Sequence, residues 1–244
     1  MLKRHKTAII VILVLIIAAG GFWYMKNNNS EDNDKEKIFF ATGFTLFDNE
    51  TELVWTETVQ LSEEDRAQFA KRAAEIKVDL AKQAGKDDRL ADYNNLAIYQ
   101  NYLGNYRESY DAYLESLKLE SQNRVVWQNF ADVLLKIKAY KSAEFAYKKA
   151  VELNKYIPES YVKLANYYRT VSDDEKTEAT YKLAIQSIKD SSESDTLVLN
   201  DYADWLVDKK RYDEAIKILE ELIIKQPGNK EAIEREIEQL RSKK

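Results

Sequence analysis

The sequence predicts an all-α protein, an α-solenoid of about four helix pairs with a capping helix at each end. Three observations predict this class. Bulky and small apolar residues recur at a fixed spacing of 34 residues, the chain has only two prolines and six glycines, and amphipathic stretches flank the repeated region. A repeat of this length buries its apolar stripe only by stacking on the next repeat, which is typical of helical solenoids.

Equivalent positions in the repeat carry a bulky residue followed four positions later by a small one. The first three copies carry this pair at Tyr93, Ala97, Trp127, Ala131, Tyr161 and Ala165. A fourth copy, with Leu199 and Ala203, follows after 38 residues rather than 34. Small residues let two antiparallel helices approach closely opposite bulky partners, so four helix pairs are predicted. The predicted repeats are residues 90–123, 124–157, 158–191 and 196–229.

This register resembles that of the tetratricopeptide repeat family over roughly residues 90–227. The motifs that carry the resemblance are Gly104-Asn105-Tyr106, Trp127, residues 138–143, residues 211–215 and Pro227. The third copy departs from the family pattern at Asp174 and Thr177, and a capping box from Ser172 to Glu175 is predicted to start its second helix. The resemblance implies that the first helix of each pair lines a concave surface on which peptides bind.

Amphipathic helices are predicted on both sides of the repeats. On the amino-terminal side, residues 62–85 begin with Ser62, a good N-cap, and place Phe69 and Leu80 on one apolar face. At the other end, residues 229–244 combine Ile233 with further apolar residues at helical spacing and a charged outer face. Helices with one polar face are what the ends of a solenoid need for solubility.

An apolar stretch near the amino terminus, residues 8–25, contains no charged side chain. Its length predicts a transmembrane helix, because a bilayer span takes about 20 apolar residues whereas a cleaved signal peptide has a shorter core. The basic flank, residues 1–7, is predicted to stay in the cytoplasm. The expected product is a single-pass membrane protein with an extracytoplasmic carboxy-terminal domain. Removal by signal peptidase after residues 18–20 is the alternative interpretation.

Two segments connect this stretch to the helices. Residues 26–37 are rich in Asn, Asp, Glu and Lys and are predicted to form a flexible linker. Residues 38–61 are rich in Phe, Thr, Val and Trp and are predicted to form a short β-hairpin with its turn at 48–50. Because an isolated hairpin is marginally stable in water, two interpretations stay open. The hairpin docks on the repeats, which is favoured, or it pairs with a strand of another protein.

The residues needed for catalysis are scarce. The chain has no cysteine, and its one histidine is His5, in the basic flank. A thiol nucleophile, a thiolate metal site and a Ser-His-Asp triad are therefore excluded from the repeat region. The formal charge of −5 disfavours nucleic acid as a partner. We expect a protein that is not an enzyme and that uses no metal and no cofactor.

Polar side chains occupy most of the inward positions that the family resemblance assigns to the first helices. The predicted peptide-binding groove consists of Asn94, Asn101, Gln128, Asn129, Asp132, Asn166, Arg169, Asn200 and Asp204. An amide offers a donor and an acceptor together, so several of them can hold the backbone of an extended peptide. A solvated surface is also polar without binding anything. Both interpretations stay open at the level of the sequence.

These features predict a membrane-anchored scaffold or adaptor that binds peptide segments or partner subunits outside the cytoplasm. The partner is expected to be a protein or peptide, and residues 8–25 are expected to contact the membrane. The alternative is a translocon-associated or periplasmic chaperone for secreted clients. One stable partner would indicate the adaptor, and many transient clients would indicate the chaperone. The pattern names neither the partner nor an oligomeric state.

Overall fold

The computed structural model describes residues 46–47, 50–82, 89–189, 191 and 193–243. All elements described here belong to one compact unit, Phe47–Lys244. The predicted transmembrane helix at 8–25 and the linker at 26–37 lie outside the described residues. Among the helices that are described, none has the length and apolar character needed to cross a bilayer.

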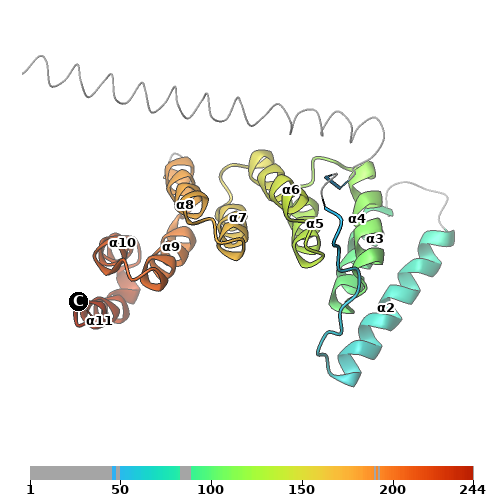
Figure 1. The fold of residues 1–244 in the computed structure, drawn as a ribbon, viewed down its shortest axis with the longest axis horizontal. Coiled ribbons are helices and arrows are strands. Elements are labelled where there is room, and N and C mark those ends of the chain that lie inside the picture. Colours follow the sequence, from blue (N-terminus) through green and yellow to red (C-terminus); the bar gives the residue numbers. More distant parts are fainter. Residues whose placement is uncertain (1–45, 48–49, 83–88, 190, 192, 244) are drawn as a thin grey trace, which may run out of the picture. The chain divides into compact units, whose positions relative to one another are not determined.

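The described residues form a right-to-left succession of helices in Figure 1, each lying next to its neighbours in sequence. The α-helices are α2 (Glu63–Lys82), α3 (Arg89–Tyr102), α4 (Tyr106–Leu119), α5 (Arg124–Lys136), α6 (Tyr140–Leu153), α7 (Pro158–Thr170), α8 (Asp174–Lys189), α9 (Thr196–Asp208), α10 (Tyr212–Lys225) and α11 (Lys230–Arg241). A short 3-10 helix, η1 (Pro227–Asn229), joins the last two.

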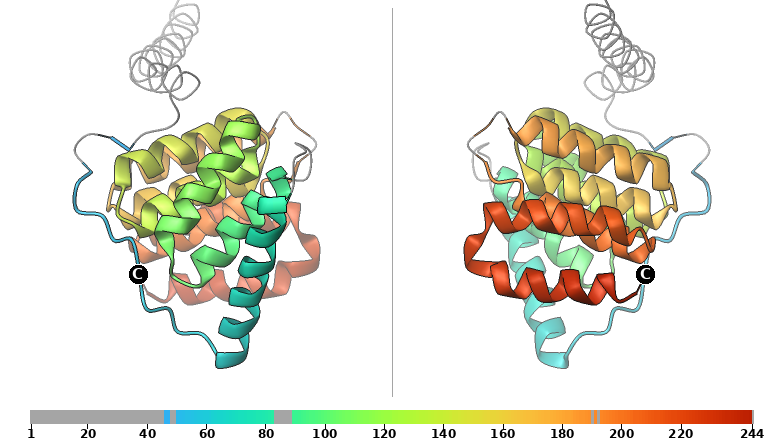
Figure 2. Two further views of the ribbon diagram at one scale, coloured as in Figure 1. Left: turned by 90° about the vertical axis from the view of Figure 1, so that its right-hand side faces the viewer. Right: turned by 90° about the vertical axis from the view of Figure 1, so that its left-hand side faces the viewer.

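The helices pack as four antiparallel pairs, α3–α4, α5–α6, α7–α8 and α9–α10, with consecutive pairs stacked on each other. Figure 2 views the stack from its two ends, with α2 nearest in one view and α10 and α11 nearest in the other. The predicted small positions lie in the core, since Ala97, Ala131 and Ala203 are fully or almost fully buried. The predicted bulky positions Trp127 and Phe130 are also buried. The predicted helix-pair solenoid is confirmed.

Both predicted capping helices are present, as α2 and α11. Ser62 caps α2, because its Oγ accepts a 3.0 Å hydrogen bond from the backbone nitrogen of Asp65. The last helix buries Ile233, Ile237 and Leu240 and leaves most of its other side chains exposed. The two ends of the stack therefore each present a polar outer face to water.

The tight turn inside each pair contains one residue in the left-handed backbone conformation. These residues are Gly104, Lys138, Ser172 and Lys210, with φ angles of 80°, 66°, 58° and 58°. A residue in this conformation ends a helix by turning the chain away from its axis, and glycine adopts it without steric cost. Only the first of the four turns uses glycine.

The predicted capping box of the third pair is wrong by one residue. Ser172 is not the N-cap of α8, because the turn after α7 already uses it in the left-handed conformation. Asp173 takes the capping role, since its Oδ1 accepts a 3.0 Å hydrogen bond from the backbone nitrogen of Lys176. Despite the departures in its sequence, the third pair forms two regular helices, α7 and α8.

The predicted hairpin at 38–61 is not found in the part of that range that the structure describes. Residues 50–59, here called the N-terminal strap, run extended beside the first two helix pairs and form one isolated antiparallel bridge, between Thr56 and Asn105. The strap is drawn in blue in Figure 1. Its backbone finds partners on the helix ends instead of on a second strand, so the docking interpretation holds for these residues.

Candidate peptide-binding groove

A cavity of about 480 Å³ opens between the first helices of the first three pairs. Its lining comes mainly from α3, α5 and α7, with two tyrosines contributed by α4 and α6. The lining residues are Ile98, Asn101, Tyr102, Tyr113, Asn129, Asp132, Leu135, Lys136, Tyr147 and Lys163. We call this set the groove. A space of this size is within the range of sites that hold a few residues of a ligand.

A carboxylate, Asp132, lies at the centre of the groove and joins two helix pairs. It accepts a 2.5 Å hydrogen bond from the hydroxyl of Tyr147 and a short hydrogen bond from the ammonium of Lys163. Burial raises the pKa of Tyr147 well above its usual range, and the neighbouring Asp132 charge raises it further. The phenol therefore stays protonated and acts as a donor, which fixes one oxygen of Asp132 in place.

Cations and amides line the rim of the groove. The ammonium of Lys136 donates a 2.9 Å hydrogen bond to the Asn101 side chain and lies 5.4 Å from the centre of the Tyr106 ring. Asn129 is half-buried, and its side chain is hydrogen-bonded to the phenol of Tyr113, which is buried. Exposed ammonium groups keep much of their hydration, so they attract an acidic side chain without requiring one.

Apolar groups complete the lining. Ile98 and Leu135 are half-buried, and Tyr102 is 48 % exposed. Side chains of this kind next to amides and cations are the combination found in ligand sites, where apolar area contributes affinity and a few polar groups set orientation. The groove can therefore hold a short extended peptide by backbone hydrogen bonds and an apolar contact.

Three of the nine predicted groove residues, Asn101, Asn129 and Asp132, line this cavity together. The other six lie elsewhere on the first helices. Gln128 accepts a 3.0 Å hydrogen bond from Arg124, which belongs to the same helix. Asn94 is half-buried, and its Oδ1 is buried without a hydrogen-bond partner among the described residues.

The remaining predicted residues belong to the third and fourth pairs. Asn166 accepts a 3.1 Å hydrogen bond from Arg169, whose guanidinium also reaches Asp201 and Asp208. The Asn200 amide donates to the backbone of its own helix and is exposed. These contacts within the protein occupy many of the hydrogen-bonding groups that were predicted to bind a ligand.

Asp204, the last of the predicted residues, lies in an acidic region. Partial burial raises its pKa, and the nearby charges of Asp201 and Asp208 raise it further. The pKa of Glu236 on α11 is also raised, first by burial and then by Asp204. The fourth pair thus presents negative charge, whereas the rim of the groove presents lysines.

Sequence reasoning did not include several lining residues in the predicted groove. Leu135 occupies the position equivalent to Asn101, 34 residues later, and Lys136 is equivalent to Tyr102. Extending the register from Asn101 along the last turn of the first helices would have found both. The role of Tyr147 had no such signal, because a tyrosine in a second helix is also expected in the core.

Comparisons with known proteins agree with the helical-repeat fold. Residues 125–156 match the family described as Tetratricopeptide repeat. The fold is similar to the crystal structure of MamA, with 17% identity and a TM-score of 0.52 over 70% of this chain and 97% of that chain. A tetratricopeptide repeat protein from Parabacteroides merdae is similar with 15% identity and a TM-score of 0.51, over 72% of each chain. No curated protein matches the sequence. At these identities the likeness to solved structures shows the fold.

Proposed function

We propose that this chain, a tetratricopeptide repeat protein, is a non-enzymatic adaptor that binds an extended peptide segment of a partner protein in the groove. The observation that carries the proposal is the cavity of about 480 Å³ that combines amides, lysines and half-buried or exposed apolar side chains on one surface. The chemistry needed is recognition alone, since no step requires a bond to be made or broken.

Each kind of lining residue has a part in this binding. The half-buried amide of Asn129 offers a donor and an acceptor to the peptide backbone. Tyr102 and Leu135 provide apolar contact for one side chain of the ligand. Lys136, which is exposed, favours an acidic residue at the rim. The Asp132–Tyr147 hydrogen bond holds the centre of the groove in a fixed geometry before the ligand arrives.

We further propose that residues 8–25 anchor the protein in a membrane, with residues 1–7 in the cytoplasm and the repeats on the other side. The support is the apolar run itself and the lysines and arginine that precede it. An anchor confines the groove to the membrane surface and raises its effective concentration toward partners held there.

A library of short random peptides, panned against the full chain in mild detergent, tests the binding proposal. Selected peptides are expected to bind the wild type and to lose at least about tenfold in affinity for Asn129→Arg, which places a long side chain in the groove. Gln186→Arg is the matched control, because Gln186 is exposed on α8, away from the groove. Equal loss in both variants, or no selected peptide that depends on Asn129, would contradict the proposal.

A further inference from the structure

The N-terminal strap is held on the repeats by hydrogen bonds between backbones. The backbone nitrogen of Val54 donates to the carbonyl of Ile137, and that of Glu57 donates to the carbonyl of Gly104, each at 3.1 Å. In the opposite direction, the backbone nitrogen of Arg107 donates to the carbonyl of Trp55 at 3.3 Å. Backbone pairing of this kind holds any extended peptide of suitable shape, as in strand addition.

Gly104 leaves room for the strap where the two backbones come closest. A Cβ atom built on Gly104 would lie 2.1 Å from the carbonyl oxygen of Glu57 and 3.0 Å from a methyl of Val59. The φ angle of 80° favours glycine at this position as well. At this position the other three turns carry a side chain, whereas the first turn carries none. A second backbone can therefore pass close to the first turn.

Trp55 is the main side-chain contact of the strap. The guanidinium of Arg107 lies 3.5 Å from the centre of the Trp55 ring, and Tyr110 packs edge-on against the ring at 5.5 Å. A cation over an indole face is the most favourable form of this interaction. The helix end at α4 thus recognises an aromatic residue in the extended segment.

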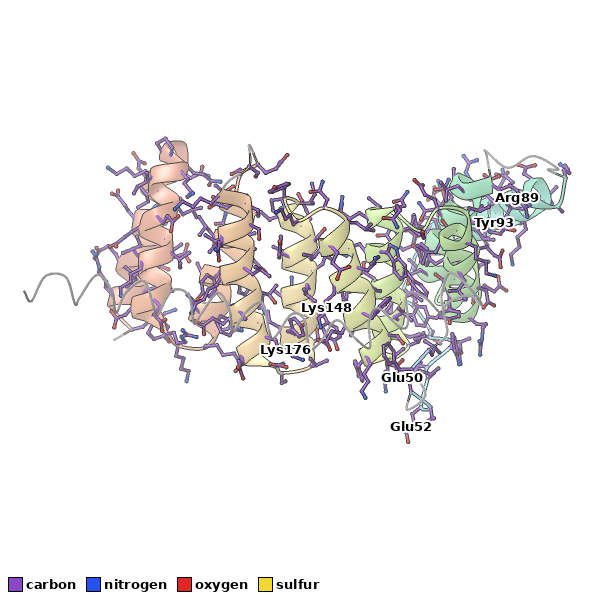
Figure 3. All side chains as sticks on the ribbon, turned by 90° about the horizontal axis from the view of Figure 1, so that it is seen from above. Glu50, Glu52, Arg89, Tyr93, Lys148 and Lys176 are labelled. Atoms are coloured by element: carbon purple, nitrogen blue, oxygen red, sulfur yellow. The ribbon has the colours of Figure 1, made fainter. Side chains whose placement is uncertain are left out.

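Two glutamates flank the tryptophan. The Glu50 carboxylate accepts hydrogen bonds from the backbone nitrogens of Lys141 and Ser142, at 2.6 and 3.1 Å, and so caps α6 from ninety-one and ninety-two residues away. The residue at the N-cap position of α6 is Ala139, which offers no side-chain acceptor. On the other side, Glu57 accepts a short hydrogen bond from the hydroxyl of Tyr106. Figure 3 labels Glu50 beside the helices and Glu52 farther out.

The strap lies on the surface and is nowhere enclosed. Residues 50–59 are all exposed or half-buried, and none of them is buried. The groups that receive the strap belong to the helix ends and the turns, which are formed by residues of the repeats themselves. An extended segment that is held in this way exchanges with a competitor of the same chemistry when the competitor binds more tightly.

We propose that this edge of the first two repeats, centred on Gly104, Arg107 and Ser142, is a second peptide-binding surface and that the strap is its internal, displaceable ligand. The partner it fits is an extended segment with a carboxylate, an aromatic residue five positions later and a second carboxylate two positions after that. The groove is a separate surface, because its lining residues include neither the strap nor Gly104, Arg107 and Ser142.

A labelled synthetic peptide of residues 46–60, followed by fluorescence anisotropy with the full chain in mild detergent, tests this surface. The strap is weakened by the pair Glu50→Gln and Trp55→Ala, which removes the α6 cap and the stacked indole. The peptide is expected to bind this variant at least about tenfold more tightly than the wild type, because the internal competitor is weaker. Adding Gly104→Ala is expected to abolish the gain, and adding Gly228→Ala is the matched control, since nothing lies within 4 Å of a Cβ there.

The proposal is supported if the weakened variant binds the peptide more tightly than the wild type does, and if Gly104→Ala abolishes this gain in affinity whereas Gly228→Ala does not. Equal weak binding by the wild type and the weakened variant overturns it, provided circular dichroism shows the same helical signal in both. If the double variant unfolds, Glu50→Gln alone is compared with Glu52→Gln, which changes an exposed glutamate of the same segment. Tighter peptide binding only by Glu50→Gln then supports the proposal, and equal binding by the two overturns it.

Discussion

The hydroxyl of Tyr147 donates a 2.5 Å hydrogen bond to the carboxylate of Asp132, across the interface between the two helices of the second pair. The other oxygen of Asp132 accepts from Lys163, which belongs to the third pair. One carboxylate thus connects two repeats at the centre of the groove. The shape of the groove and the stability of the stack depend on the same contact.

Replacing Tyr147 with phenylalanine is expected to lower the free energy of unfolding by about 1–2 kcal/mol, because Asp132 loses a donor in a partly buried site. Urea denaturation followed by circular dichroism measures the change. Tyr140→Phe is the control, because Tyr140 is 43 % exposed and its loss of a hydroxyl should change stability by less than about 0.5 kcal/mol. Equal effects of the two substitutions would contradict the role of the Asp132 contact.

Lys210→Gly is expected to stabilise the protein by about 1 kcal/mol, because it removes the steric cost of a side chain in the left-handed conformation. Lys210 has a φ of 58°, whereas its neighbour Lys209, at −81°, is already in an ordinary conformation. Lys209→Gly is therefore the control and should be neutral or destabilising. Thermal unfolding of the two variants compares them, and a lower melting temperature for Lys210→Gly would count against this reading of the turn.

An ion pair between the third and fourth repeats gives the fold a dependence on pH. Glu178 accepts hydrogen bonds from both terminal nitrogens of Arg211, at 2.6 and 3.0 Å. The Arg211 hydrogen bonds lower the pKa of Glu178 from 4.5 to about 2, although partial burial opposes the shift. Because the pKa is lower in the folded state, the pair stabilises the fold above about pH 4.5, and this stabilisation is lost as the pH falls toward about 2.

The Glu178→Gln variant is expected to be less stable than the wild type at neutral pH. The difference in the free energy of unfolding should shrink as the pH falls from about 4.5 toward about 2. Chemical denaturation at several pH values follows the difference. Glu175→Gln, which changes an exposed carboxylate in the same helix, should show a small difference at every pH. A gap between wild type and Glu178→Gln that stays constant down to low pH would be inconsistent with the lowered pKa.

The cap that Glu50 provides for α6 has a measurable contribution of its own. Glu50→Gln is expected to lower the free energy of unfolding by about 1 kcal/mol, because a charged acceptor at a helix N-terminus is replaced by a neutral one. Glu52→Gln, in the same strap and exposed, should have little effect. Denaturation curves of both variants make the comparison. If Glu52→Gln lowers the free energy of unfolding as much as Glu50→Gln does, the effect is caused by the change in net charge and not by the loss of the cap.

Periodicity was sufficient to predict the helix pairs, because each buried position recurs with the residue type that the packing requires. Ala97 and Ala131 are fully buried, as the small positions of a close helix contact must be. The cap of α8 was misplaced because Ser172 and Asp173 are both good capping residues. Their roles are decided by the turn that precedes the helix, which leaves Ser172 in the left-handed conformation.

The strap and much of the groove were not predictable in the same way. The composition of residues 38–61 favours extended structure. The bridge partner of Thr56, however, is Asn105, which lies far along the chain, and the sequence of the strap does not indicate this partner. The groove depends on which side chains already bind each other. Asn200 satisfies its amide within its own helix, whereas Asn129 lines the cavity, and the repeat register places both in a first helix.

The most direct measurement is in-cell photocrosslinking from a photoreactive residue at Asn129, with Gln186 on α8 as the control position, followed by mass spectrometry. If peptides bind in the groove, a protein partner is crosslinked from Asn129 and not from Gln186. One dominant partner would support the adaptor. A broad set of secreted clients would indicate that the protein is a chaperone that uses the same groove. Absence of any product from Asn129, or the same products from both positions, would contradict peptide binding in the groove.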